Sequence, residues 1–213
     1  IGMKDPNPKV SGKGIEELRR SGINVVSGVL EEDSMKLNEA YAKYIMTKRP
    51  FVTLKVAMTL DGKIATPEGE SKWITGEKAR KEVHRLRSRV DAVMTAIGTV
   101  KADDPQLTAR CQGLKVSRVQ EIKNPKRIVI DPNLEIQLNA RVLQTPPETI
   151  IVTKGFGVRG QGSGVGEKKK MLLDRGVRII EYDSERLDLG WLLERLGKME
   201  ITSVLIEGGS SLN

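Results

Sequence analysis

The sequence has few of the residues that metal sites and hydrolytic triads require. Cys111 is the only cysteine and His84 the only histidine, so an internal disulfide is impossible and no His/Cys ligand set for a catalytic zinc ion can be assembled. The same scarcity argues against Ser-His-Asp and Cys-His hydrolysis. We therefore expect no metal site in this chain, a free thiol at Cys111, and His84 on the surface of an arginine-rich helix.

Long apolar runs are also missing. No apolar stretch approaches the roughly 18 residues that span a bilayer, and the start Ile1-Gly2-Met3-Lys4 is not followed by the apolar segment of a signal peptide. The single cysteine agrees with a reducing compartment. These absences favour a cytoplasmic protein that has no membrane partner.

Aromatic residues make up only 3% of the chain, whereas its formal net charge is +8. The positive charge suits anionic partners, which include nucleic acids and phosphorylated small molecules. However, the cations are dispersed and do not alternate with aromatic residues that could stack on bases. We therefore expect no nucleic-acid partner, and a basic nucleic-acid-binding module remains an alternative hypothesis.

The first fifty residues form a segment of their own. Residues 14–22 predict a short helix, residues 23–26 a strand, and residues 31–46 a helix whose apolar positions should face a core. Lys48-Arg49-Pro50 interrupts this pattern, because proline disfavours helix in the residue before it. We therefore predict one domain over residues 1–48 and a second over residues 49–213.

Short β-branched strands alternate with helices in the second domain. Strands are predicted at residues 51–58, 92–97, 127–130, 149–152, 177–180 and 203–206, and helices at 76–89 and 187–199. Continuously apolar strands of this kind indicate an α/β fold with a mainly parallel sheet covered by helices on both faces. The glycine-rich residues 154–166 predict a surface loop, with a phosphate-binding loop as the alternative.

Three polar segments follow predicted strands, at residues 69–76, 98–110 and 207–211. Because ligands of parallel sheets bind at the carboxyl ends of strands, these segments are candidates for a site. Arg87 and Arg110 could hold a phosphate through several N–H donors each. From the residues alone, Asp103-Asp104-Pro105 also fits an ordinary turn, and Trp73 also fits a core position.

Four motifs, taken together, resemble the reductase domain of the bifunctional riboflavin-biosynthesis deaminase/reductase family. They occur in the order and spacing of that family: LKVAMTLDGKIAT (54–66), GESKWITG (69–76), GTVKADDPQLTAR (98–110) and LIEGGSSLN (205–213). Residues 2–33 look like the tail of the family's deaminase domain. The resemblance implies that residues 1–48 are the C-terminal remnant of a cytidine-deaminase-like α/β domain. It implies a dihydrofolate-reductase-like reductase domain over residues 49–213, which the family continues past Asn213.

The resemblance also implies a reaction. The family uses NADPH to reduce the ribose of 5-amino-6-(5-phosphoribosylamino)uracil to the ribitylamino product. Its zinc ion belongs to the deaminase part, whose zinc-binding motifs should precede Ile1, so the complete protein is expected to deaminate the preceding pyrimidine as well. The family tends to form dimers, so a homodimer or a higher homo-oligomer is expected. A dihydrofolate-reductase-like enzyme with another carbonyl or imine substrate is the alternative.

Site residues follow from the resemblance position by position. Expected substrate contacts are Ser71, Arg87, Leu107, Arg110 and Glu207. Expected cofactor contacts are Ala57, Trp73, Thr99, Asp103 and Gly209, with Thr75 and Lys55 close to them. Glu207 and Asp103 are the candidate catalytic acids, and solvent is the alternative source of the proton.

Overall fold

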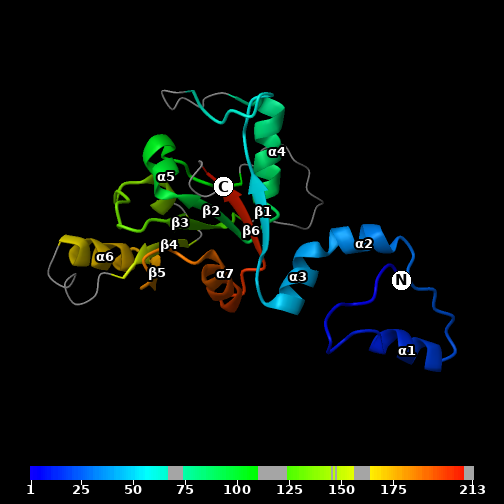
Figure 1. Ribbon diagram of the computed structural model, residues 1–213. Coiled ribbons are helices and arrows are strands. Elements are labelled where there is room, and N and C mark those ends of the chain that lie inside the picture. Colours follow the sequence, from blue (N-terminus) through cyan, green and yellow to red (C-terminus); the bar gives the residue numbers. More distant parts are fainter. Residues whose placement is uncertain (67–73, 110–123, 145, 147, 156–163, 209–213) are drawn as a thin grey trace. The chain divides into compact units, whose positions relative to one another are not determined.

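The computed structural model describes residues 1–66, 74–109, 124–144, 146, 148–155 and 164–208 (Figure 1). The chain divides into two compact units, Ile1–Phe51 with Leu189–Ser203 and Val52–Asp188 with Val204–Asn213. The domain boundary predicted between residues 48 and 49 stays a prediction, because the first unit also takes in a segment from near the other end of the chain. In the part that the structure describes, no helix is long and apolar enough to cross a membrane.

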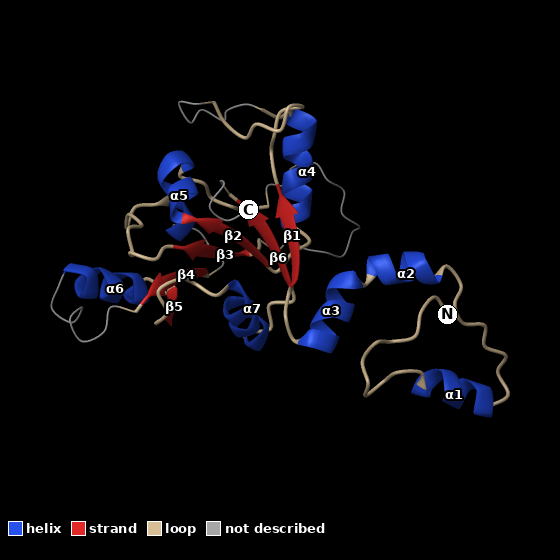
Figure 2. Cartoon of the chain, viewed as in Figure 1, coloured by secondary structure: helices blue, strands red, loops and turns tan. Residues whose placement is uncertain are grey.

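One six-stranded sheet organises the second unit, with strand order β1-β6-β2-β3-β4-β5 (Figures 1 and 2). The pairs β6–β2, β2–β3, β3–β4 and β4–β5 are all parallel. This agrees with apolar strands that are buried on both faces, so the prediction of a mainly parallel sheet is confirmed. The strands are β1 (Phe51–Lys55), β2 (Ala92–Ala96), β3 (Lys126–Ile130), β4 (Thr149–Lys154), β5 (Arg178–Tyr182) and β6 (Ser203–Glu207).

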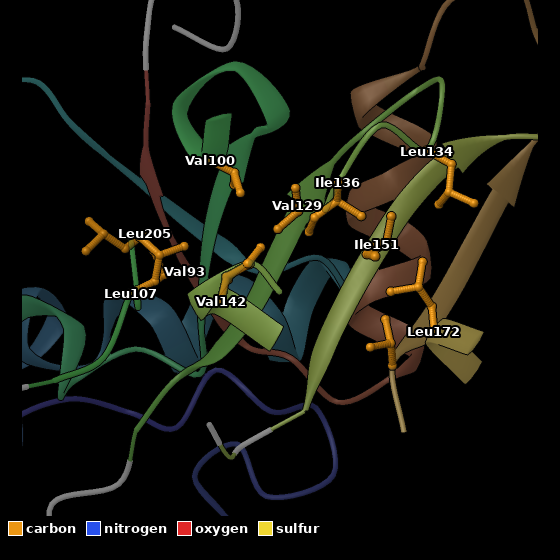
Figure 3. Packing of buried hydrophobic residues seen from close by; sticks show 12 residues of the cluster. Val93, Val100, Leu107, Val129, Leu134, Ile136, Val142, Ile151, Leu172 and Leu205 are labelled. Carbon is orange, nitrogen blue, oxygen red and sulfur yellow. The ribbon is translucent and has the colours of Figure 1, made fainter. Parts of the chain in front are cut away.

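One face of this sheet carries the main apolar cluster (Figure 3). Val93, Val129, Ile151 and Leu205 come from adjacent strands, and each is 0% exposed. Full burial of such a side chain contributes about 1.5–3 kcal/mol relative to exposure. The helices of this unit are α4 (Glu77–Arg87), α5 (Ile97–Asp103), the 3₁₀ turn η1 (Arg141–Leu143) and α6 (Gly164–Asp174). Each of them contributes a side chain to the cluster or packs one against it.

Helix α6 begins inside a segment that the sequence predicts to be a loop. Residues 154–166 were expected to form a loop, but Gly164 already begins a helix. Leu172 of this helix is completely buried in the apolar cluster. Tertiary burial therefore stabilises a helix whose glycine-rich first turn has low intrinsic helix propensity.

The first unit contains helices α1 (Lys13–Arg20), α2 (Glu31–Leu37), α3 (Glu39–Thr47) and α7 (Leu189–Lys198). The helix predicted over residues 31–46 is present, with a break at Asn38. The expectation that its apolar positions face a core is wrong, because α1, α2 and α3 contain no buried residue and Leu37 is 85% exposed. Helical periodicity identifies a face suited to burial, but it does not supply the partner that covers it.

Residues 23–26 form no strand, contrary to the sequence-based prediction. Ile23 and Val26 are 51% and 64% exposed. A β-branched run forms a strand only where a neighbouring strand offers its backbone hydrogen bonds. No such neighbour is assigned in the described residues around this run.

Helix α7 contacts the end of α3 inside the first unit. Tyr44 Oη donates to the carbonyl of Gly197 at 3.2 Å, and the Arg49 guanidinium pairs with Glu194. At Gly197 the backbone of the other segment comes very close. A Cβ there would overlap the carbonyl oxygen of Lys48 and lie 3.0 Å from its carbonyl carbon. Glycine is therefore required at this point of α7.

Candidate active site

The register of the parallel sheet fixes the direction of Glu207. Val93 of β2 pairs with Leu205 of β6, and both side chains belong to the apolar cluster. Side chains two residues apart on a strand point to the same face, so Glu207 points to the face that carries the cluster. Glu207 is the last residue of β6 and Lys55 the last residue of the neighbouring β1. Two charged side chains are therefore placed at one edge of the sheet.

Arg87, Lys55 and Glu207 form a charged cluster at this edge. Arg87 donates from Nε and Nη2 to the two carboxylate oxygens of Glu207, at 2.6 and 2.8 Å. Lys55 Nζ lies 3.6 Å from Oε2 of the same carboxylate. The side chains of Arg87 and Glu207 are 15% and 8% exposed. Two cations thus lie next to one carboxylate. The two hydrogen bonds from Arg87, which are largely buried, hold the Glu207 carboxylate in a fixed orientation.

The C-terminal end of α4 also holds the segment that contains Leu107. Arg87 Nη1 donates to the carbonyl oxygen of Thr108 at 3.2 Å, and His84 Nδ1 lies 3.1 Å from the same oxygen. The amide of Ala109 donates to Oδ1 of Asn124 at 3.0 Å. Arg87 is therefore hydrogen-bonded to both Glu207 and the backbone that follows Leu107.

Leu107 has an unusual backbone conformation. Its φ is +53° and its side chain is 3% exposed within the apolar cluster. The left-handed region is strained for a residue with a branched side chain. Because the whole residue is buried, Leu107 makes no exposed contact surface in the described structure, and the substrate contact expected at this position stays a prediction.

The described cofactor positions lie on segments that follow β1 and β2. Ala57 comes two residues after β1 and is half-buried, and Thr99 lies half-buried in α5. Asp103 is the last residue of α5 and is exposed. Its neighbour Asp104 has φ +40° and accepts a hydrogen bond from the Arg141 amide at 2.8 Å through Oδ1. Asp104 thus has the structural role of a turn residue.

Several expected site residues lie outside the described residues, namely Ser71, Trp73, Arg110 and Gly209. Thr75 is described, and its carbonyl accepts from Arg80 Nη1 at 2.8 Å. The described residues contain no group of three or more histidine, cysteine or acidic side chains that could hold a metal ion.

Sequence reasoning missed two residues that anchor the site. His84 was expected at the surface, but it is half-buried and contacts the Thr108 carbonyl. Its spacing of three residues from Arg87 was an available signal, since residues three apart lie on one side of a helix. Asn124 carries no comparable signal. It contacts Ala109 across two irregular segments, and no helical or strand spacing relates the two residues.

The comparisons with known proteins place the chain in a family. The model of the RibD C-terminal domain matches residues 50–213. The chain belongs to this family. It is 44% identical over 215 residues to the riboflavin biosynthesis protein RibD of Actinobacillus pleuropneumoniae, covering 100% of this chain and 54% of that protein. It is 43% identical to the RibD protein of Aquifex aeolicus, covering 98% of this chain and 54% of that one.

Solved RibD structures have the same fold. The deaminase/reductase of Thermotoga maritima is 38% identical with a TM-score of 0.77, covering 100% of this chain and 54% of that one. A RibD structure of Acinetobacter baumannii is 38% identical with a TM-score of 0.80, covering 98% and 54%. The chain therefore spans about half the length of the RibD proteins it matches. The fold and the family expected from the four sequence motifs are confirmed.

Proposed function

We propose that this RibD-family chain is an oxidoreductase that uses NADPH to reduce the ribose of 5-amino-6-(5-phosphoribosylamino)uracil in riboflavin biosynthesis. Membership of the RibD C-terminal domain family supports the reaction class. The observation that carries the proposal is the little exposed pair of Arg87 and Glu207, with Lys55 beside it, where β6 and β1 end. Ligands of parallel sheets bind at this edge.

The residues around this edge fit a dinucleotide cofactor and a phosphorylated sugar. Ala57, Thr99 and Asp103 follow β1 and β2 and would hold the cofactor. NADPH, when bound, supplies the hydride for C1′ of the opened sugar. The remaining residues expected to contact either ligand, Ser71, Trp73, Arg110 and Gly209, belong to this proposal on the basis of the family motifs alone.

Glu207 is suited to orient the sugar. Both of its carboxylate oxygens accept hydrogen bonds from Arg87, and each retains a lone pair for a sugar hydroxyl. Reduction of the opened sugar also requires a proton at the heteroatom that develops charge. The ammonium group of Lys55, 3.6 Å from Glu207, is a proton-bearing group next to that position, and solvent is the other source. Asp103 is exposed at the end of α5, which makes it the weaker candidate acid.

Steady-state kinetics of the full-length protein test this proposal. With the phosphoribosylaminopyrimidine substrate, we expect NADPH to be oxidised and the ribitylamino product to form in equal amounts. Arg110→Ala should raise the KM for this substrate while leaving the KM for its dephosphorylated analogue unchanged. An unchanged KM for the phosphorylated substrate would refute phosphate recognition by Arg110 and favour a dihydrofolate-reductase-like enzyme with another substrate.

The curated relatives extend over about twice the length of this chain. We infer that the complete protein also carries a zinc-dependent deaminase and forms a homodimer or a higher homo-oligomer. The Thermotoga maritima structure, which is described as both a deaminase and a reductase, supports the first inference. Zinc analysis and light scattering on the full-length protein test these two points. A protein without zinc-dependent deamination, or a strict monomer, would contradict them.

A further inference from the structure

Two side chains of α4 converge on a single backbone oxygen. His84 Nδ1 lies 3.1 Å from the Thr108 carbonyl oxygen, and Arg87 Nη1 donates to it at 3.2 Å. A carbonyl oxygen can only accept hydrogen bonds and has two lone pairs, so it can accept both of these. His84 must therefore carry a proton on Nδ1. The contact with the carbonyl fixes the tautomer of the ring when it is neutral.

The backbone held in this way includes the strained residue of the site. Leu107 has φ +53° and a side chain buried in the apolar cluster. Two residues later, the Ala109 amide donates to Asn124 Oδ1. Residues 107–109 are thus held at three points: the buried side chain of Leu107, the carbonyl of Thr108 and the amide of Ala109. A leucine keeps a strained positive φ only where surrounding contacts hold it in place. The contacts of residues 107–109 supply that constraint.

Arg87 links this backbone to Glu207. One guanidinium group donates through Nη1 to Thr108 and through Nε and Nη2 to the Glu207 carboxylate. The guanidinium group is planar and rigid, so the position of the Thr108 carbonyl affects where the other two donors point. A displacement of Thr108 would therefore be transmitted to the carboxylate.

We propose that His84 is a positioning residue of the reductase site. It fixes the Thr108 carbonyl and thereby the backbone of Leu107 and, through Arg87, the orientation of Glu207. This inference rests on the proposed function, because Leu107 and Glu207 are the expected substrate contacts. In this role, His84 itself touches neither the substrate nor the cofactor.

Two substitutions separate this role from a contribution to folding. His84→Leu removes the donor at similar volume, whereas His84→Asn keeps an N–H donor at about the position of Nδ1. In the full-length protein, His84→Leu should raise the substrate KM by about three- to tenfold, the effect of losing one hydrogen bond, and leave NADPH affinity unchanged. His84→Asn should restore the KM to within about twofold of wild type.

The matched control is Arg85→Ala on the same helix. This substitution removes the exposed Arg85–Glu82 pair, which has no link to Thr108 among the described contacts, so the substrate KM should stay at the wild-type value. A protein that is only partly unfolded would show a lower kcat at an unchanged KM. A wild-type KM in His84→Leu, or equal defects in the Leu and Asn variants, would overturn the inference.

Hydrogen exchange without any ligand keeps this test independent of the reaction. The Ala109 amide should exchange faster in His84→Leu than in wild type, and at nearly the wild-type rate in His84→Asn. Unchanged exchange in His84→Leu would overturn the positioning of residues 107–109, even in an active enzyme. A wild-type protein without reductase activity would overturn the proposed function, and the exchange rates would then decide the anchoring role alone.

Discussion

The pair formed by Arg87 and Glu207 should be one of the stronger polar interactions in the second unit. Its two hydrogen bonds measure 2.6 and 2.8 Å, and its side chains are only 15% and 8% exposed. Among the described residues, replacing Arg87 with methionine would leave a buried carboxylate with Lys55 at 3.6 Å as its remaining cation. Breaking a fully buried pair costs about 3–5 kcal/mol. Because Lys55 remains and Arg87 is partly exposed, we expect a loss of about 2–3 kcal/mol for Arg87→Met.

A double-mutant cycle isolates the pairwise contribution. Arg87→Met, Glu207→Gln and the double variant should give a coupling free energy of about 1–3 kcal/mol in urea denaturation followed by circular dichroism. Arg87→Lys keeps the charge but loses the planar fork, so about 1–2 kcal/mol of stability should be lost. These values follow from the burial and the bidentate geometry of the pair.

The same helix offers a matched control. Arg85 donates from Nε and Nη2 to the two carboxylate oxygens of Glu82 at 2.7 and 2.5 Å, but these side chains are 42% and 48% exposed. An exposed pair of this kind should show a coupling free energy clearly smaller than that of the buried pair, because water screens the two charges. Both pairs have bidentate geometry, but they differ in burial, so equal coupling free energies would refute the argument that burial strengthens the Arg87–Glu207 pair.

Three further substitutions test other parts of the fold by urea denaturation. Gly197→Ala should destabilise the protein by about 1–3 kcal/mol, since its Cβ would overlap the Lys48 carbonyl oxygen; Gly14→Ala, with nothing within 4 Å, should not. Thr95→Val should stabilise by about 1 kcal/mol, because the Thr95 hydroxyl is fully buried and has no hydrogen-bond partner in the described part of the chain. Burial raises the pKa of Tyr182 above its ordinary 10.0, so the folded state keeps the phenolic proton to a higher pH than the unfolded state does. The free energy of unfolding should therefore fall as the pH rises above 10.0, and Tyr182→Phe should make that fall smaller.

Each of these has a result that would contradict it. Equal unfolding midpoints for the two alanine variants would mean that the backbone near Gly197 moves aside at little cost. A lower midpoint for Thr95→Val would show that the hydroxyl does make a hydrogen bond. An identical pH dependence in wild type and Tyr182→Phe would mean that the phenol is solvated in the folded protein.

The parallel sheet could be predicted because the composition of each short segment is enough to indicate a buried strand. Each strand is a short run of β-branched and apolar residues, and burial on both faces requires that composition. Residues 23–26 have the same composition and form no strand, because pairing depends on a neighbour that the run itself does not specify. Helix α6 was partly missed for the opposite reason, since burial of Leu172 outweighs the low helix propensity of its first turn.

The candidate site was predictable in its members but not in their contacts. Arg87 and Glu207 were both expected to contact the substrate, yet they are 120 residues apart and the sequence does not indicate that they bind each other. The expectation that Arg87 binds the phosphate stays a prediction, and most of its hydrogen-bonding capacity is used by Glu207 and Thr108. His84 was expected at the surface because a lone histidine in a basic helix does not by itself indicate a buried partner; its spacing of three residues from Arg87 was the signal that the two side chains share one side of the helix.

The proposed reaction transfers a hydride from NADPH to the sugar of a phosphoribosylaminopyrimidine. The most direct measurement is a single-turnover reaction of the full-length protein with NADPH deuterated at C4 of the nicotinamide, followed by mass spectrometry of the pyrimidine. We expect a ribitylamino product that carries one deuterium at C1′. A product without deuterium at that carbon, or unconsumed cofactor in the presence of the substrate, would contradict it.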